Sequence, residues 1–297
     1  MLSLASLAAL LSCLSSPADS TRDSVAEEMD FQFSFVVLAD PHISSSPEHE
    51  ARLETAVDWI NAQEQDRSIE LVVVVGDIGW GAGLETSATQ LGGLSPTWFP
   101  ILGDNEIAFG DEARFQEVFA PQYEVLASTY PDYRRGQIEV EEDGQIMTLQ
   151  NHVFTHRGLT WVGLDWNARG KTGLLSEFAY LHDVPGGSLP FLADVLQDLE
   201  ATQAEDILLF SHHPMHLGSF NEVEMASITD LTGPLEGRIA GAYAGHIHQN
   251  ASVLVEEGGY TAWVTDATWD DENTLRVVSV YSNGTRQRYE QELVILD

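Results

Sequence analysis

The sequence predicts an α/β fold in which a mostly parallel sheet comes first and antiparallel strands follow. In the first third of the chain, continuous apolar runs typical of buried strands alternate with segments of helical spacing. Residues 252–296 instead alternate between apolar and polar positions and are rich in Val, Thr, Tyr and Trp, which favours antiparallel strands. A length of 297 residues with 43% hydrophobic content is enough for one large globular domain.

The first half of the domain has the order strand, helix, strand, helix, strand. Apolar runs at 33–40, 69–77 and 98–102 are predicted to be strands, and the spacing of apolar residues at 49–65 and 85–91 predicts helices. Strands separated by helices at this spacing indicate right-handed crossovers and a mostly parallel sheet.

The second half contains further apolar runs of strand length and one more helix. We expect strands at 147–156, 159–166, 207–210 and 239–244, and a helix at 189–200. Turns are expected at 256–259 and 283–285 within the antiparallel C-terminal part.

The N-terminus predicts export. Residues 1–20 form an uncharged apolar run typical of a signal peptide, or of a lipoprotein leader in which Cys13 would carry the lipid. Residues 21–30 are predicted to be a polar linker, and 31–297 the folded domain. No later segment is apolar for long enough to cross a membrane, so we expect a protein that is secreted, periplasmic or lipid-anchored outside the cell.

The charge balance excludes polyanionic partners. Thirteen Lys plus Arg stand against 47 Asp plus Glu, which gives a formal net charge of −34. Such a field repels nucleic acid and anionic membrane surfaces, so we expect no nucleic-acid partner. Oligomeric state cannot be predicted from the sequence.

Side chains that can bind metal follow several of the predicted strands. Because the carboxyl ends of parallel strands open into one crevice, side chains far apart in the sequence are expected to meet there. A lone Asp after a strand is more often a helix cap, and a lone His more often a core or surface group, so the ordered set carries the prediction. The set is Asp40, His42, Asp77, Asp104, Asn105, His212, His213, His246 and His248.

With these motifs in order, the sequence resembles the calcineurin-like metallophosphoesterase superfamily over nearly the whole chain after the linker. That family shows D-x-H, G-D, G-N-H-[DE], H-x-P and G-H-x-H in this order. The corresponding segments here are Asp40-Pro41-His42, Gly76-Asp77, Gly103-Asp104-Asn105-Glu106, His212-His213-Pro214 and Gly245-His246-Ile247-His248. The resemblance implies two packed mixed β-sheets flanked by helices, a four-layer sandwich.

The resemblance also implies a dinuclear metal centre and a reaction. Asp40, His42 and His248 would bind one ion, a second set of Asp104, His212 and His246 would bind the other, and Asp77 would bridge them. Two ions about 3.5–4 Å apart lower the pKa of a shared water, and the resulting hydroxide would cleave a phosphate mono- or diester. Mixed Asp and His ligands suit Fe, Mn and Zn, so the identity of the metal stays open.

Two departures from related family patterns involve three positions. Asp104 stands where the family has a ligating Asn, and Asn105 stands where it has a catalytic His. Loss of a general acid typically costs ~10²- to 10⁴-fold in rate. Asn105, His213 and His216 are the candidates to replace it, although such histidines more often orient metal ligands. The other departure is Trp80, which stands where purple acid phosphatases have an iron-binding Tyr and cannot bind metal.

The lost histidine leaves two functions open. The chain is predicted to be a metallophosphoesterase, and the alternative is a metal-binding pseudo-enzyme or scaffold that has lost catalysis. Specificity is expected from the loops at 79–97, 167–187 and 215–227.

Overall fold

The computed structural model describes residues 28–169, 178–202, 206–235, 237–270 and 272–296. The predicted leader, Cys13 and most of the linker lie outside the described residues, so export and lipidation stay predictions. In the described part of the chain, no helix combines the length and apolarity needed to cross a bilayer.

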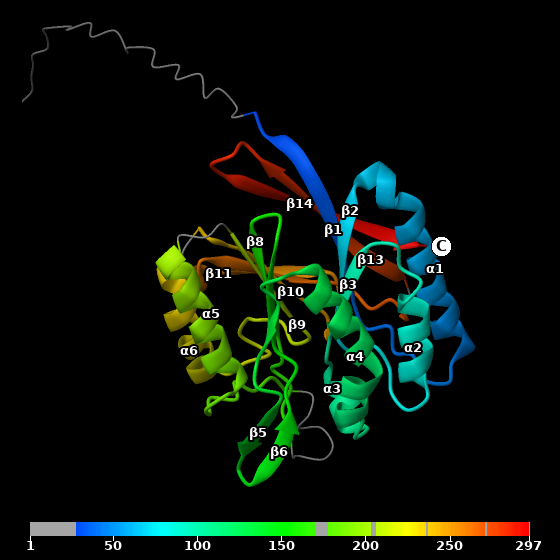
Figure 1. The fold of residues 1–297 in the computed structure, drawn as a ribbon, viewed down its shortest axis with the longest axis horizontal. Coiled ribbons are helices and arrows are strands. Elements are labelled where there is room, and N and C mark those ends of the chain that lie inside the picture. Colours follow the sequence, from blue (N-terminus) through cyan, green and yellow to red (C-terminus); the bar gives the residue numbers. More distant parts are fainter. Residues whose placement is uncertain (1–27, 170–177, 203–205, 236, 271, 297) are drawn as a thin grey trace, which may run out of the picture.

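The first sheet has five strands in the order β14-β13-β1-β2-β3 (Figure 1). β1, β2 and β3 run parallel, as the sequence predicts. β13 lies antiparallel beside β1, and β14 lies antiparallel beside β13. The strands are β1 Asp30–Leu38, β2 Ile69–Val75, β3 Thr97–Ile101, β13 Asn273–Ser282 and β14 Gln287–Leu296.

The second sheet has seven strands in the order β11-β12-β10-β9-β8-β7-β4. Its four central strands are parallel, whereas β11, β7 and β4 are antiparallel to their neighbours. The strands are β4 Arg134–Arg135, β7 His152–His156, β8 Leu159–Leu164, β9 Ile207–Ser211, β10 Ile239–Ala244, β11 Ala251–Val255 and β12 Tyr260–Val264. The expectation of a wholly antiparallel C-terminal part is therefore wrong for β12, because β11 takes the sheet edge and β12 inserts between it and β10.

Helices cover the outer faces of both sheets, so the chain has the four layers that the resemblance implies (Figure 1). α1, α2 and α4 pack on the first sheet, and α5 and α6 on the second. These helices are α1 Pro47–Arg67, α2 Gly83–Leu91, α4 Glu112–Thr129, α5 Ser188–Thr202 and α6 Glu222–Thr232. Three short helices complete the fold, α3 Asp104–Ala108, η1 Gly233–Leu235 and η2 Glu256–Gly258.

Local signals explain where α1 begins and ends. The side chain of Ser46 accepts a hydrogen bond from the backbone N–H of His49, and Pro47 occupies the first turn, where no N–H is needed. The helix ends at Ser68, which adopts the left-handed conformation. α1 is thus two residues longer at each end than the predicted 49–65.

The single strand predicted at 147–156 is wrong. The chain forms two strands there, β6 (Gln145–Thr148), which pairs only with β5 (Glu139–Glu142), and β7 in the large sheet. The run breaks because the N–H of Gln150 donates to the carboxylate of Asp165, 3.0 Å away, and does not join a strand ladder.

Aromatic side chains pack between the two sheets. The ring of Phe35 on β1 contacts Trp161, Phe210 and Tyr243 on the second sheet, at centroid distances of 4.9, 6.0 and 5.5 Å. Each such pair contributes about 0.5–1.5 kcal/mol beyond its buried area. This packing fixes the strand ends of one sheet opposite those of the other.

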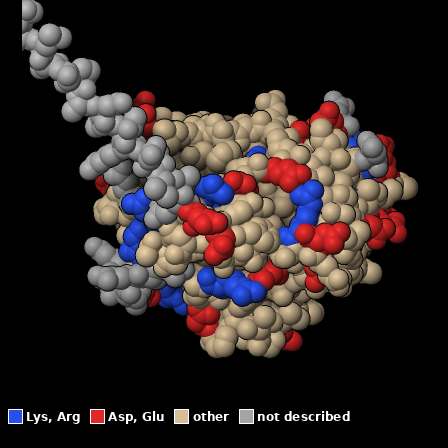
Figure 2. All heavy atoms as spheres, turned by 90° about the horizontal axis from the view of Figure 1, so that it is seen from above, with Lys and Arg blue, Asp and Glu red and all other residues tan. Residues whose placement is uncertain are grey.

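Many of the arginines on the surface lie among carboxylates. Figure 2 shows one face, on which basic and acidic side chains are interspersed. Arg67 pairs with Glu292 at 2.6 Å, and Arg114 pairs with Glu85 at 2.7 Å. Exposed pairs of this kind add little stability, and the large negative net charge remains.

Candidate metal centre

The first sheet supplies three buried carboxylates at the ends of its parallel strands. Asp40 follows β1, Asp77 follows β2, and Asp104 begins α3 after β3. Their exposed fractions are 0%, 2% and 4%. Three neighbouring carboxylates this deeply buried need compensating positive charge.

The second sheet supplies histidines from the ends of its own parallel strands. His212 and His213 follow β9, whereas His246 and His248 follow β10. His42, two residues after Asp40, is the one histidine of the predicted ligand set that comes from the first sheet.

The structure brings these side chains together in overlapping groups. One group, with potential ligand atoms within 4.8 Å of one another, contains Asp40, His42 and His248, the first predicted set. In the second predicted set, Asp104 Oδ1 lies 2.7 Å from His212 Nε2 and 3.1 Å from His246 Nδ1. The first group matches the first predicted set. The second predicted set does not form one such group, because Asp104 and His246 group with His213, whereas His212 groups with Asp40 and Asp77. Metal binding itself stays a prediction.

Asp77 lies between the two sets. One carboxylate oxygen is 3.2 Å from His42 Nε2, and the other is 3.4 Å from His212 Nε2. A carboxylate that presents one oxygen to each set is placed as a bridging ligand requires.

His212 is oriented as a metal-binding histidine usually is. Its Nδ1 lies 3.0 Å from the carbonyl oxygen of Val75, to which it donates, so Nε2 faces Asp77 and Asp104. Metal-bound histidines commonly donate their second nitrogen to a backbone carbonyl in this way. The ring fits because Gly76 has no Cβ, which would overlap it.

Backbone strain is concentrated at the same residues. Nine non-glycine residues in the described part of the chain have positive φ, and five belong to the predicted ligand set. They are Asp40, His42, Asp77, His246 and His248, with φ between 47° and 70°. Strain of this kind typically persists where function requires it, and it is independent of the motif match.

The pKa values of the three carboxylates are shifted in different directions. Burial raises the pKa of Asp40, and the neighbouring Asp77 and Asp104 raise it further, which outweighs the attraction of His212. Burial also raises the pKa of Asp77, but His212 and His42 outweigh it and hold that pKa below its usual range. For Asp104, hydrogen bonds from His212 and His246 overcome burial and lower the pKa strongly.

The centre opens into a cavity of about 570 Å³. Among the described residues its walls contain no lysine or arginine; they are Asp77, Asp104, Asn105, Phe178, His216, Gly218, Ser219, His246, Ile247 and His248. A phosphate could bind beside these carboxylates only if cations neutralised them. The chemistry of the side chains therefore fits a metal centre, and Asp and His ligands suit Fe, Mn or Zn.

The three candidates for proton transfer occupy different environments. Asn105 lines the cavity, but its backbone N–H donates to Asp77 Oδ1 at 2.9 Å and its side-chain amide donates to Asp77 Oδ2. His216 is half-buried at the cavity wall, and its Nδ1 lies 2.5 Å from the carbonyl of Leu217, which leaves Nε2 for exchange. A role of His216 in proton transfer stays a prediction.

His213 is fully buried and does not line the cavity. Neither of its ring nitrogens has a hydrogen-bond partner, and the residue groups with Asp104 and His246 as a further possible ligand set. Burial lowers its pKa, and the neighbouring His246 and His212 lower it further. A buried neutral imidazole is better placed to support the ligands than to protonate a leaving group.

Glu106 connects the loops that carry two of the carboxylates. Its side chain accepts hydrogen bonds from the N–H of Gly79, at 3.0 Å, and from the N–H of Gly103, at 2.9 Å. Burial and the charge of Asp77 raise its pKa to about 8. The bond to Gly103 is local to the start of α3, whereas the bond to Gly79 depends on the tertiary fold.

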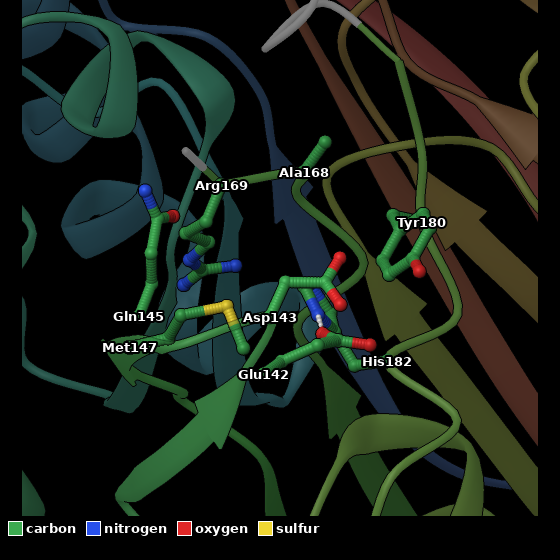
Figure 3. Close-up of a pocket in the computed structure, with 8 residues that line it drawn as sticks. All are labelled: Glu142, Asp143, Gln145, Met147, Ala168, Arg169, Tyr180 and His182. Atoms are coloured by element: carbon green, nitrogen blue, oxygen red, sulfur yellow. Dashed lines mark hydrogen bonds and ion pairs between the residues drawn. The ribbon is translucent and has the colours of Figure 1, made fainter. Parts of the chain in front are cut away.

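A second cavity, of about 160 Å³, lies beside the β5–β6 hairpin (Figure 3). Glu142 and His182 point toward each other there, at 2.8 Å, and the other ring nitrogen of His182 lies 2.8 Å from the carbonyl of Asn167. Arg169 is occupied by Asp165, at 2.6 Å, and by Glu112, at 3.1 Å. Because Glu142, His182 and Arg169 are paired with other side chains or with the backbone, this cavity is a weaker candidate than the metal centre.

A known protein family matches most of the chain. The family model described as calcineurin-like phosphoesterase matches residues 33–250. A search of curated protein sequences gave no match. The solved structures that resemble the chain include GAP50, described as the anchor in the inner membrane complex of Plasmodium, with 10% identity, a TM-score of 0.49 and coverage of 90% of each chain.

Vps29 proteins are also among the similar structures. The zinc complex of Vps29 from Entamoeba histolytica has 10% identity and a TM-score of 0.29, with 89% of this chain and 100% of that chain covered. Vps29 from Cryptosporidium parvum has 9% identity and a TM-score of 0.32, with 90% and 100% covered. Since the family model spans most of the chain and the motifs meet in one centre, the chain belongs to the calcineurin-like phosphoesterase family.

Proposed function

We propose that this protein is a metal-dependent hydrolase of phosphate mono- or diesters. The observation that carries the proposal is the meeting of three buried carboxylates and four histidines beside an open cavity whose described walls contain no lysine or arginine. Such a site binds an anionic ester only together with metal ions.

Each part of the chain has a defined task in this proposal. Asp40, His42 and His248 would hold one ion, a second group of Asp104, His212 and His246 would hold the other, and Asp77 would serve both. Metal ions bound there would supply Lewis-acid chemistry, lowering the pKa of a water molecule and neutralising phosphoryl oxygens.

Two further residues would position Asp77 and protonate the leaving group. Asn105 holds both oxygens of Asp77 through its backbone and side-chain N–H groups, and so fixes the bridging carboxylate. His216 Nε2 would give a proton to the leaving alcohol at the cavity wall, a role that general acids fill with ~10²- to 10⁴-fold effect.

The test measures metal content and turnover on the same preparations. Protein stripped with chelator and reloaded with Mn²⁺, Zn²⁺ or Fe²⁺ should bind about two ions per chain and hydrolyse p-nitrophenyl phosphate or its bis ester. Asp77→Asn should abolish turnover, whereas the matched change Asp58→Asn on the exposed face of α1 should not.

One observation favours the alternative of a metal-binding scaffold. Asn105 stands where the family has a catalytic histidine, and its side chain is occupied by Asp77. Stoichiometric metal with no turnover on a broad panel of esters would establish the scaffold and refute the hydrolase. Loose binding of many ions, weakened by salt, would instead indicate sequestration by the acidic surface.

A further inference from the structure

An apolar groove lies next to the cavity of the metal centre. It measures about 370 Å³ and lies between α6 and the edge strand β11. The described residues that line it are His216, Leu217, Glu222, Met225, Ala226, Thr229, Val253, Leu254, Val255 and Glu257. We call it the α6–β11 groove.

His216 belongs to both hollows. It lines the α6–β11 groove and also the cavity of the metal centre, and the next residues divide between the two. Leu217 lines the groove, whereas Gly218 and Ser219 line the cavity. The two hollows therefore meet at His216, and a ligand that occupied both would have to pass this side chain.

Exposed apolar side chains line both hollows. Thirteen large hydrophobic residues are exposed in the described part of the chain, and five of them line one hollow or the other. Phe178 and Ile247 lie at the cavity, while Leu217, Val253 and Leu254 lie at the groove. Contiguous exposed apolar surface of this kind commonly marks a ligand-binding groove.

The charges orient the ligand. The groove carries two carboxylates, Glu222 and Glu257, and no lysine or arginine among its described residues, so a phosphate is repelled there. At the other end, the metal centre is built to accept one. The buried thioether of Met225 lines the groove, and methionine adapts well to irregular apolar shapes.

We infer that the substrate is a phosphate ester of an apolar alcohol, whose hydrocarbon part occupies the α6–β11 groove while its phosphate lies at the metal centre. This rests on the proposed function. Hydrolysis adds water across the P–O bond, so that phosphate remains at the centre and the alcohol, with a proton on its oxygen, leaves past His216.

Binding of n-alkyl phosphonates with two to ten carbons tests the inference without needing turnover. Calorimetry on the metal-loaded protein should show affinity rising about fourfold for each methylene that enters the groove, the equivalent of about 0.8 kcal/mol. The rise should end once the groove is filled. An affinity independent of chain length would overturn the inference and leave the groove and the β11 edge to a protein partner.

Variants locate the apolar subsite. The double change Leu217→Asn with Leu254→Asn should reduce the total gain from two to ten carbons at least about tenfold, while the affinity for the two-carbon phosphonate stays unchanged. Both leucines are exposed, at 61% and 64%, so folding is not at risk. The matched control is Leu293→Asn on β14, the edge strand of the other sheet, where the leucine is 44% exposed. An equal loss in the control would overturn the assignment.

The two proposals fail in different ways. If the protein hydrolyses p-nitrophenyl phosphate but its affinity for alkyl phosphonates does not depend on chain length, the apolar subsite is refuted and the hydrolase proposal stands. If affinity rises steeply with chain length, the double variant abolishes this rise and the protein hydrolyses no ester, the groove stands as a ligand site and the hydrolase proposal is refuted.

Discussion

The two sheets meet at two polar junctions that differ in how charge is balanced. At the start of β2, Glu70 contacts His156, the last residue of β7, at 2.8 Å and also pairs with Arg157 in the turn that follows. Beyond the other end of β2, Asp77 faces the histidines of the metal centre. The first junction supplies its own cation, whereas the second gathers three carboxylates with no arginine or lysine on its described walls.

This difference distinguishes a structural contact from a functional one. A chain gains little by burying several carboxylates that repel one another, because desolvation exceeds the attraction available. The raised pKa of Asp40, caused first by burial and then by its acidic neighbours, marks that cost. The metal junction is therefore organised for a ligand with positive charge, and the Glu70 junction is organised for the fold.

The largest expected effect is on the stability that metal provides. Ligand at a hundred times its Kd stabilises a protein by about 2.7 kcal/mol, which corresponds to a rise in Tm of about 5–10 °C at 2–4 °C per kcal/mol. Thermal unfolding with and without chelator should show this rise. Asp77→Asn should lose it and Glu70→Gln should keep it; a rise that Asp77→Asn retains would contradict the assignment of the bridging carboxylate.

The second effect is on turnover. Asn105→His returns an imidazole to the cavity wall and should raise kcat for alkyl phosphates, which have poor leaving groups, by about 10- to 100-fold. The gain should be smaller for p-nitrophenyl phosphate, whose leaving group needs no proton. Asn105→Ala serves as the control, because it removes the amide bond to Asp77 without adding an acid. Equal gains on both esters would exclude proton donation as the cause.

The sequence predicts the metal junction better than its surroundings. The strands before Asp40, Asp77 and Asp104 are continuous apolar runs, so both the sheet and the residues at its edge can be predicted locally. The family motifs then indicate which side chains meet. The structure agrees in placing these side chains together, although their roles stay predictions.

The parts that sequence analysis missed depend on tertiary contacts. α4 has apolar residues at helical spacing, Phe115, Phe119, Tyr123 and Leu126, but Pro121 interrupts the pattern and the helix was not predicted. α6 overlaps a segment expected to be a specificity loop, residues 215–227. The α6–β11 groove gathers residues from 216 to 257, and no local pattern shows that they share a surface.

The third effect separates stability from metal binding at Asp40. Replacing Asp40 by Asn removes a buried charge whose raised pKa shows that ionisation is unfavourable there, while the amide oxygen can still accept from the N–H of His246. In chelator, Asp40→Asn should be more stable than the wild type by about 1–2 kcal/mol. With excess metal the order should reverse, because the wild type alone gains the full stabilisation. Thermal unfolding under the two conditions measures both; a variant less stable in chelator would contradict the view that this charge is costly.

The smallest effect belongs to the Glu70 junction and depends on pH. Burial raises the pKa of Glu70, but Arg157 and His156 outweigh it, so the folded protein holds this pKa below the usual 4.5. The pair therefore stabilises the fold above about pH 4.5, and this contribution is lost as the pH falls through the lower folded pKa. Glu70→Gln should cost up to about 1 kcal/mol at pH 7, since the pair is partly exposed.

Urea unfolding in chelator at pH 7 and at pH 3.5 measures this contribution. The difference between Glu70→Gln and the wild type should shrink at the lower pH, because the wild type then loses the same interaction. Burial lowers the pKa of His156 and the contact with Glu70 raises it, so the comparison is made in a His156→Gln background, where that contribution is absent. A difference that stays constant with pH would mean that Glu70 stabilises the junction by packing and not by charge, and the contrast between the two junctions would lose its electrostatic basis.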